Sequence, residues 1–347
     1  MKKFLLNILP VRVKKSIISA IKWMDLCLVK VCAKNGRLSS FYYLFFSRRF
    51  DREHLAVLRG RLSYEDSLRE IGQSSPLLRR NIHRLEKGLI MQPRRPLFAE
   101  AFILETVRCY QAAREKPGFL EGELQWAQDV IGEYFTTVGP SPIIDAARAE
   151  YESGIPEAVV QTFDAVPPFK PYPVSSLPDI KITFVELKKL FTRRRSTRWY
   201  QNKPVPDELI QKTIEAASLA PSACNRQPFH FVVANGRNAA RKIADCAGGT
   251  TGFAQQLPAV IVVVGDLAAY PFERDRHLIY IDASLASMQL MLAAETLGLA
   301  TCPINWPDVD SAESRLHKIL SFASHQRVIM LIAIGFAELT GGIPYSQ

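Results

Sequence analysis

The chain has 347 residues, of which 48% are hydrophobic and 22% charged, so it suits a globular protein with a sizeable core and room for two domains. Its formal net charge of +10 is confined to residues 1–60, which carry 13 Lys and Arg against 3 Asp and Glu. The rest of the chain is neutral overall. Attraction to an anionic partner is therefore expected to start in this segment.

The cysteine pattern excludes two classes of small domain. There are 6 cysteines, none in a C-x-x-C pair, and no Cys/His spacing matches a zinc site, so no metal is predicted. The usage is far from a disulfide scaffold and favours the reducing cytoplasm. The sequence also contains no zinc finger, RNP-like strand or glycine-rich KH loop, so nucleic acid is not expected as a partner.

Residues 1–60 form a basic amphipathic segment. The first ten residues superficially suggest a signal peptide, but Pro10 and the basic residues after it interrupt the apolar run, and no small-residue cleavage site follows. Helical spacing of apolar residues then continues from Val13 to Cys32. Three charged residues interrupt that helix, which falls short of the roughly 18 uncharged residues that a spanning helix needs.

The aromatic run Phe41–Phe46 is followed directly by Arg48 and Arg49. Two interpretations stay open for this part of the segment. The helix lies on an anionic membrane surface, at the inner face of the membrane, or it packs on the rest of the protein.

Residues 61–165 are predicted to be a helical region. Its clearest helix has apolar residues at 78, 82, 85 and 89 and a polar face of Arg79, Arg80, His83, Arg84 and Lys87. That face is either solvated or in contact with an anionic substrate. Residues 166–183 are rich in proline and are read as an extended linker or a strap over a neighbour.

Residues 184–347 are expected to form one further domain, in which strands alternate with helices. This alternation indicates an α/β protein, arranged as an α+β sandwich. The strand at Pro258–Gly265 is continuously apolar and should be covered on both faces. The expected helices are Phe184–Arg193, Pro206–Leu219, Asn238–Cys246, His277–Leu297 and Ala312–Leu320, and the expected strands are Phe229–Ala234, Pro258–Gly265, Thr301–Ile304 and Val328–Phe336.

Two stretches in this domain carry groups suited to binding. Arg193–Tyr200 packs guanidinium groups around a hydroxyl at a helix end, and such forks grip phosphate bidentately. Ala220–Phe229 is a loop that runs into a strand and presents amide and backbone groups, which suits a flat heterocycle. The alternative for both is a basic helix end followed by a capped turn.

Together the two stretches resemble the FMN-dependent nitroreductase family, whose first helix ends in R-x-S-x-R/K and whose P-S-x-x-N-x-Q-P-W/F loop follows roughly twenty-five residues later. The resemblance covers about residues 184–347 and implies a nitroreductase-like FMN-binding fold. It implies that Arg194, Arg195 and Ser196 meet the phosphate and ribityl end of FMN, and that Arg198 lies near N1 and the C2 carbonyl. It places four loop residues on the pyrimidine side of the ring: Pro221, Ser222, Asn225 and Gln227.

A third segment also matches the family. In G-L-x-x-x-P-I, the residues Pro303, Ile304 and Asn305 would reach the N5 side of the flavin. Many relatives have Glu-Gly where this chain has Asn305-Trp306, which leaves the substrate class open. The Gly248–Gly252 loop lacks the Lys-Ser/Thr ending of a P-loop and is expected near the flavin or the substrate. Cys302 is expected to be structural.

The chain departs from the family after its closing strand, where no Lys or Arg follows. We expect either weaker FMN binding or a phosphate met by Arg193, Arg194 and Arg195 alone. The resemblance implies a homodimer with a flavin site at the two-fold interface. It also implies an FMN-dependent enzyme that uses NAD(P)H in a ping-pong reduction of a small organic substrate, with no residue assigned as an acid, base or nucleophile.

Two alternatives stay open. One is a catalytically degenerate flavin-fold protein that serves as a binding or scaffold partner in a membrane-associated biosynthetic pathway. The other is a flavin-destroying or dehalogenating relative, for which the sequence contains no selective feature. NADH and NADPH are not distinguished.

Overall fold

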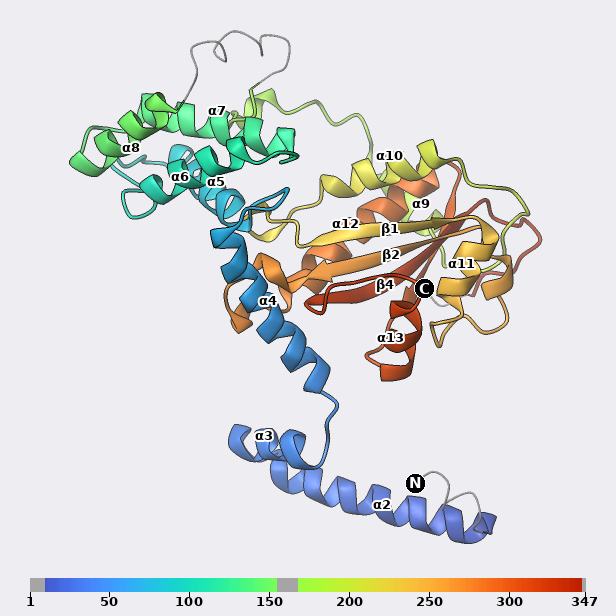
Figure 1. Ribbon diagram of the computed structural model, residues 1–347. Coiled ribbons are helices and arrows are strands. Elements are labelled where there is room, and N and C mark those ends of the chain that lie inside the picture. Colours follow the sequence, from blue (N-terminus) through green and yellow to red (C-terminus); the bar gives the residue numbers. More distant parts are fainter. Residues whose placement is uncertain (1–9, 155–167, 345–347) are drawn as a thin grey trace. The chain divides into compact units, whose positions relative to one another are not determined.

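The computed structural model describes residues 10–154 and 168–344, and the chain divides into two compact units, Met1–Leu55 and Ala56–Gln347 (Figure 1). The signal-like start, the beginning of the proline-rich segment and the last three residues lie outside the described residues. The helices are α2 (Val11–Cys32), α3 (Gly36–Phe45), α4 (Asp51–Arg69), α5 (Pro76–Leu89), α6 (Ile103–Glu115), α7 (Glu121–Thr137), α8 (Pro142–Ser153), α9 (Phe184–Arg193), α10 (Asp207–Ser218), α11 (Arg237–Ala244), α12 (Leu278–Thr296) and α13 (Asp310–His317). The strands are β1 (Phe229–Asn235), β2 (Ala259–Asp266), β3 (Ala300–Asn305) and β4 (Gln326–Gly335).

The first unit consists of α2, α3 and the start of α4. The side chain of Asn35 caps α3 by accepting from the backbone N–H of Leu38 at 2.9 Å. The Tyr42 hydroxyl donates to Oδ1 of Asp25 at 2.5 Å and ties the two helices together. Only Cys32 is buried in α2, so most apolar side chains of this helix face away from any protein core. The helix predicted from Val13 is confirmed and begins two residues earlier.

The second unit contains the helical region α5–α8 with its own core. The apolar face predicted for α5 is confirmed, because Leu78, Ile82 and Leu85 are all 0% exposed. Ser75 caps the helix and Pro76 occupies its first turn, which is why α5 begins there. Full burial of each such side chain contributes about 1.5–3 kcal/mol relative to exposure.

The sheet has the strand order β1-β2-β4-β3, and every neighbouring pair is antiparallel. Side chains of β2 alternate between two cores. Val260, Val262 and Val264 face α11 and α13, whereas Ile261 and Val263 face α10 and α12. The strand is therefore covered on both faces, as predicted, and the α+β sandwich is confirmed (Figure 1).

Helix α12 is the central helix of this sandwich and packs on α10, β2 and β3. With the turn before it, the span Glu273–Thr296 is long and apolar enough to cross a membrane by length and composition alone, although 44% of that window is buried inside the protein. One stripe of the helix stays on the surface, where Ile281, Leu285 and Met288 are 47%, 44% and 39% exposed.

Candidate functional site

The segment Arg194–Arg198 is held beside strand β3. Helix α9 begins with a capping box of Thr183 and Glu186 and ends at Arg193, so the chain leaves it in an extended conformation. The backbone N–H of Thr197 donates to the carbonyl of Thr301 at 3.0 Å, and Ser196 forms a parallel bridge with Thr301. This pairing fixes the R-x-S-x-R stretch against the strand that ends in Pro303–Asn305.

A pocket of about 370 Å³ opens where these two segments meet. It brings together Arg198 and the three residues expected at the N5 side of a flavin. Gly248 and Gly249 of the glycine-rich loop after α11 line the same pocket. The lining residues are Arg198, Gly248, Gly249, Phe253, Cys302, Pro303, Ile304, Asn305 and Pro307.

The clustered arginines have different partners. Arg193 forms an ion pair with Glu295 of α12 at 3.3 Å, so its charge is already met. Arg195 donates to the backbone carbonyls of Phe191 and Arg194 at 3.3 and 2.9 Å. The guanidinium of Arg194 has no hydrogen bond or ion pair within the part of the chain that the structure describes.

Burial shifts the pKa of two titratable groups near these arginines. Burial raises the pKa of Glu295 above its ordinary value, although Arg193 and Arg194 lower it in part. Burial likewise raises the pKa of the Cys302 thiol, against the influence of Arg198 and a hydrogen bond with Ser196. A thiol that resists ionisation is a poor nucleophile, which agrees with the absence of a catalytic role for Cys302 in the sequence prediction.

The pocket suits a phosphorylated ligand with a flat polar edge. The Arg198 guanidinium lines the pocket and makes one weak contact, 3.4 Å from Nη1 to the backbone carbonyl of Ser196. The Oγ1 atom of Thr301 is buried without a hydrogen-bond partner among the described atoms. A Cβ on Gly248 would meet nothing within 4 Å, so the backbone there is open to a ligand. These features fit FMN.

The second predicted motif is a tightly bonded loop at the N-terminal half of α12. The Ser222 hydroxyl and the Ala223 N–H both donate to Oδ2 of buried Asp282, at 2.7 and 2.9 Å. The N–H of Gln227 donates back to Oγ of Ser222 at 2.7 Å. These bonds hold Cys224, Asn225 and Gln227 at positive φ, a conformation that costs about 1–3 kcal/mol for each non-glycine residue.

The two motifs lie at opposite ends of α12. Arg193 contacts Glu295 near the C-terminal end, whereas Ser222 contacts Asp282 near the N-terminal end. Thirteen residues of α-helix separate these two contacts, which is roughly 20 Å at 1.5 Å per residue. One chain therefore brings Arg194, Ser196 and Arg198 together with Pro303–Asn305, but not with the Pro221–Gln227 loop.

The family model described as "Nitroreductase family" matches residues 191–251 and 247–336. A relative from Archaeoglobus fulgidus, provisionally named NADH dehydrogenase/NAD(P)H nitroreductase, is 35% identical over 160 residues, which are 44% of this chain and 85% of that protein. The chain belongs to the nitroreductase family.

Two further comparisons concern the same part of this nitroreductase-family chain. An FMN reductase [NAD(P)H] from Bacillus subtilis is 31% identical over 134 residues, which are 34% of this chain and 53% of the relative. The solved structure of an FMN-dependent nitroreductase from Clostridium difficile is 26% identical, with a TM-score of 0.39, and covers 45% of this chain and 91% of that one. The resemblance read from the motifs is confirmed, and family membership makes the C-terminal part an oxidoreductase domain.

Several residues at the nitroreductase-family site lie outside the sequence motifs. Phe253 and Pro307 line the pocket, and Asp282 and Arg79 hold the Ser222–Gln227 loop. Asp282 could have been found from the sequence, because a carboxylate near the start of a largely apolar helix needs a partner. Phe253 and Pro307 gave no such signal, since apolar residues after a loop are common in any core.

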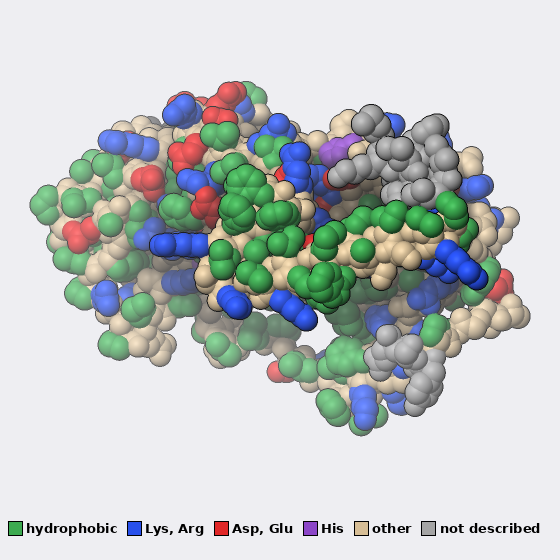
Figure 2. All heavy atoms as spheres, turned by 90° about the horizontal axis from the view of Figure 1, so that it is seen from below, with side chains coloured by type: hydrophobic (Ala, Val, Ile, Leu, Met, Phe, Trp, Pro, Cys, Tyr) green, Lys and Arg blue, Asp and Glu red, His purple; other side chains and the backbone are tan. Residues whose placement is uncertain are grey.

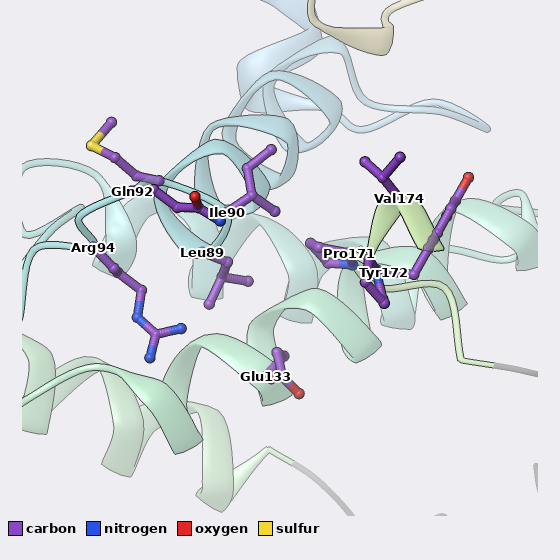
Figure 3. Close-up of a pocket in the computed structure, with 10 residues that line it drawn as sticks. Leu89, Ile90, Gln92, Arg94, Glu133, Pro171, Tyr172 and Val174 are labelled. Atoms are coloured by element: carbon purple, nitrogen blue, oxygen red, sulfur yellow. The ribbon is translucent and has the colours of Figure 1, made fainter. Parts of the chain in front are cut away.

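A larger hollow, about 710 Å³, lies outside the nitroreductase-family region (Figure 3). Its walls are the end of α5 with the turn after it, α7, and the proline-rich segment Pro171–Val174, which runs over α7. Arg94 and Glu133 point toward it, and Glu133 is already paired with Lys170 at 2.9 Å. The hollow offers no redox-active or nucleophilic group, so it is not the candidate site.

Proposed function

We propose that this protein is an FMN-dependent oxidoreductase that takes a hydride from NAD(P)H and reduces a small organic substrate by a ping-pong route. One observation carries the proposal: Arg198 lines a single pocket with Pro303, Ile304 and Asn305, and the Arg194–Arg198 segment is paired with the strand that ends in those residues. Membership of the nitroreductase family supports the reaction class.

The residues of the pocket have distinct roles in this proposal. Arg194 and Ser196 hold the phosphate and ribityl end, where a guanidinium fork binds phosphate oxygens. FMN, when bound, supplies the reversible two-electron chemistry. Arg198 places a fixed positive charge in the pocket, which favours negative charge that develops at the pyrimidine edge. Pro303, Ile304 and Asn305 form the wall that orients the ring and excludes water.

We propose that the site is completed by a second copy of the chain. The Ser222–Gln227 loop and the end of α9 contact α12 at points about 20 Å apart along the helix, so a flavin in the pocket is expected to meet the loop of a partner. The exposed apolar stripe of α12 and the exposed Phe184 and Phe191 of α9 suit a two-fold interface. Family resemblance implies the same arrangement.

The purified full-length protein provides the test. It is expected to be yellow, to release FMN on denaturation, and to oxidise NADH or NADPH with a nitroarene or quinone as acceptor. Colourless protein that also fails to take up added FMN would contradict the proposal. Yellow protein that oxidises neither nicotinamide with any acceptor would instead support the scaffold alternative.

We further propose that the first unit binds an acidic membrane surface from the cytoplasmic side. Along α2, exposed apolar residues such as Ile21, Trp23 and Met24 stand among lysines and arginines. Figure 2 shows hydrophobic side chains gathered along this face with basic side chains at its edges. Apolar insertion combined with attraction to anionic headgroups is the usual basis for such binding.

A further inference from the structure

Helix α5 lies against the Ser222–Gln227 loop. The Arg79 guanidinium donates from Nε to the carbonyl of Asn225 at 2.7 Å and from Nη2 to Oε1 of Gln227 at 2.9 Å. Its Nη1 donates to the buried carboxylate of Glu123 at 3.0 Å, so the charge of Arg79 is met inside the protein. The helical region is thus joined to the loop that the family resemblance assigns to the flavin.

Two further arginines follow Arg79 on α5. Arg80 and Arg84 are one helical turn apart and project from the same face. Arg80 has one carboxylate partner, Glu105, at 3.6 Å. Arg84 rests on the ring of Phe102, 3.6 Å from Cζ to the centroid, and has no carboxylate partner among the residues that the structure describes. Burial and repulsion from Arg80 lower the pKa of Arg84, and attraction to Glu105 offsets part of this effect.

Arg226 adds a third guanidinium from the loop itself. It follows Asn225, and its Cζ lies 4.7 Å from the ring centroid of Tyr270. The Nε atom of Arg226 and the hydroxyl of Tyr270 are both buried, and neither has a hydrogen-bond partner among the described atoms. Buried polar atoms in native proteins are nearly always bonded, and a ligand that brings acceptors to the Arg226 side chain would supply a missing partner.

Helix α5 packs against the loop that carries Arg226. Arg79 of this helix donates to Asn225 and Gln227, the residues on either side of Arg226. Arg80, Arg84 and Arg226 therefore come from two elements in direct contact, and Glu105 contributes the carboxylate paired with Arg80.

We propose that Arg84 and Arg226, assisted by Arg80, bind the anionic group of the acceptor substrate, so that the enzyme reduces small organic molecules bearing a carboxylate, phosphate or sulfonate. Guanidinium forks bind such groups bidentately. The inference rests on the proposed function, because the loop that carries Arg226 matches the one that contacts flavin in the family. The phosphate of a flavin has the same chemistry as a substrate phosphate, and the experiment separates the two.

Matched acceptors test the proposal in the holoenzyme. Para-nitrobenzoate and para-nitrophenyl phosphate are anionic, whereas para-nitrobenzamide is neutral and similar in shape. The kcat/KM for the two anions is expected to exceed that for the amide about tenfold or more, the effect of one or two charge-assisted hydrogen bonds. Arg84→Gln and Arg226→Gln should each remove most of this preference by raising KM for the anions, with the amide unchanged.

Lys318→Gln is the matched control, because it removes one exposed charge at the end of α13 and should leave all three acceptors unaffected. Equal kcat/KM for anionic and neutral acceptors in the wild type would overturn the proposal. So would an Arg84→Gln variant that binds FMN more weakly but riboflavin equally well and keeps the acceptor preference, since the arginines would then serve the flavin phosphate. If the purified protein carries no flavin, the proposed function itself fails. If the protein is yellow but shows no preference for anionic acceptors, only the role of these arginines fails.

Discussion

Arg193, Arg194 and Arg195 are adjacent in the sequence but are used differently in the structure. Arg193 is paired with Glu295, Arg195 is bonded to backbone carbonyls, and the Arg194 guanidinium has no hydrogen bond or ion pair among the described residues. Of the three arginines expected at the phosphate, Arg194 is therefore the first to test.

Arg194→Gln is expected to weaken FMN binding about tenfold, because one charge-assisted contact to a phosphate is lost. Fluorescence titration of the apoprotein with FMN measures the change. Arg193→Gln is the neighbouring control and should leave the FMN affinity near that of the wild type. Equal losses of FMN affinity in both variants would show that the phosphate interacts with the combined charge of Arg193, Arg194 and Arg195.

Glu295→Gln tests the buried carboxyl on α12. A carboxyl whose pKa is raised in the folded chain favours folding while it is protonated, and this contribution is lost as pH rises from its ordinary value near 4.5 through the folded value. The thermal midpoint of the variant, relative to the wild type, should therefore rise between about pH 4 and pH 7.

Glu208→Gln serves as the control for Glu295→Gln, because its thermal midpoint relative to the wild type should change with pH in the opposite direction. A hydrogen bond and ion pair with Lys212 lower the pKa of Glu208, so the wild type gains stability from it above the ordinary pKa. The midpoint of this variant should fall slightly relative to the wild type over the same range. If the difference in thermal midpoint between Glu295→Gln and the wild type did not change with pH, it would contradict the raised pKa of Glu295.

At the scale of elements, the sequence predicted the helices and strands of the C-terminal domain to within three residues. Local signals explain this: residues 259–264 of β2 are apolar without interruption, and Gly298 follows α12 at positive φ. The strand order and the antiparallel pairing were not predicted, because they depend on contacts between segments far apart in sequence. The same limit hid the separation of the two motifs, which only the packing of α12 reveals.

Helix α12 also carries the prediction about assembly. Leu285→Glu places a carboxylate in the exposed apolar stripe. Burial of this charge against a partner without a counterion would be unfavourable. The variant is expected to sediment as a monomer and to lose FMN, because the partner's loop no longer reaches the pocket.

Ile319→Glu provides the comparison for Leu285→Glu, since Ile319 is 42% exposed and lies after α13, away from the stripe. It should remain a yellow dimer. A wild-type monomer that retains FMN would contradict the two-fold site, and so would a yellow dimer of Leu285→Glu.

For the whole molecule, the distribution of charge predicts reversible membrane binding through the first unit. Each Lys or Arg near an anionic leaflet contributes about 1 kcal/mol, and salt screens this attraction over roughly 8 Å at physiological ionic strength. Vesicle flotation should show binding that requires anionic lipid and falls with salt. Replacement of Lys14, Lys15, Lys22 and Lys30 by Gln lowers the charge of residues 1–60 from +10 to +6 and should weaken this binding markedly.

The matched control for flotation replaces four lysines of the second unit: Lys188, Lys189, Lys212 and Lys318. These variants should float like the wild type. A truncated variant should lack no residue beyond 50, because Ala56 and Val57 of α4 pack with Leu267 within the second unit. Equal binding to neutral vesicles, or none to either kind, would leave the first unit as a protein-packing element.

The separation of the two motifs along α12 has a genetic consequence. If each flavin lies between a pocket from one chain and a loop from the other, a subunit damaged only in the pocket still donates an intact loop. A subunit damaged only in the loop still offers an intact pocket. When two such inactive variants are refolded together, every mixed dimer contains one undamaged site, so activity should return by complementation between subunits. Sites built within single chains would stay inactive in the mixture.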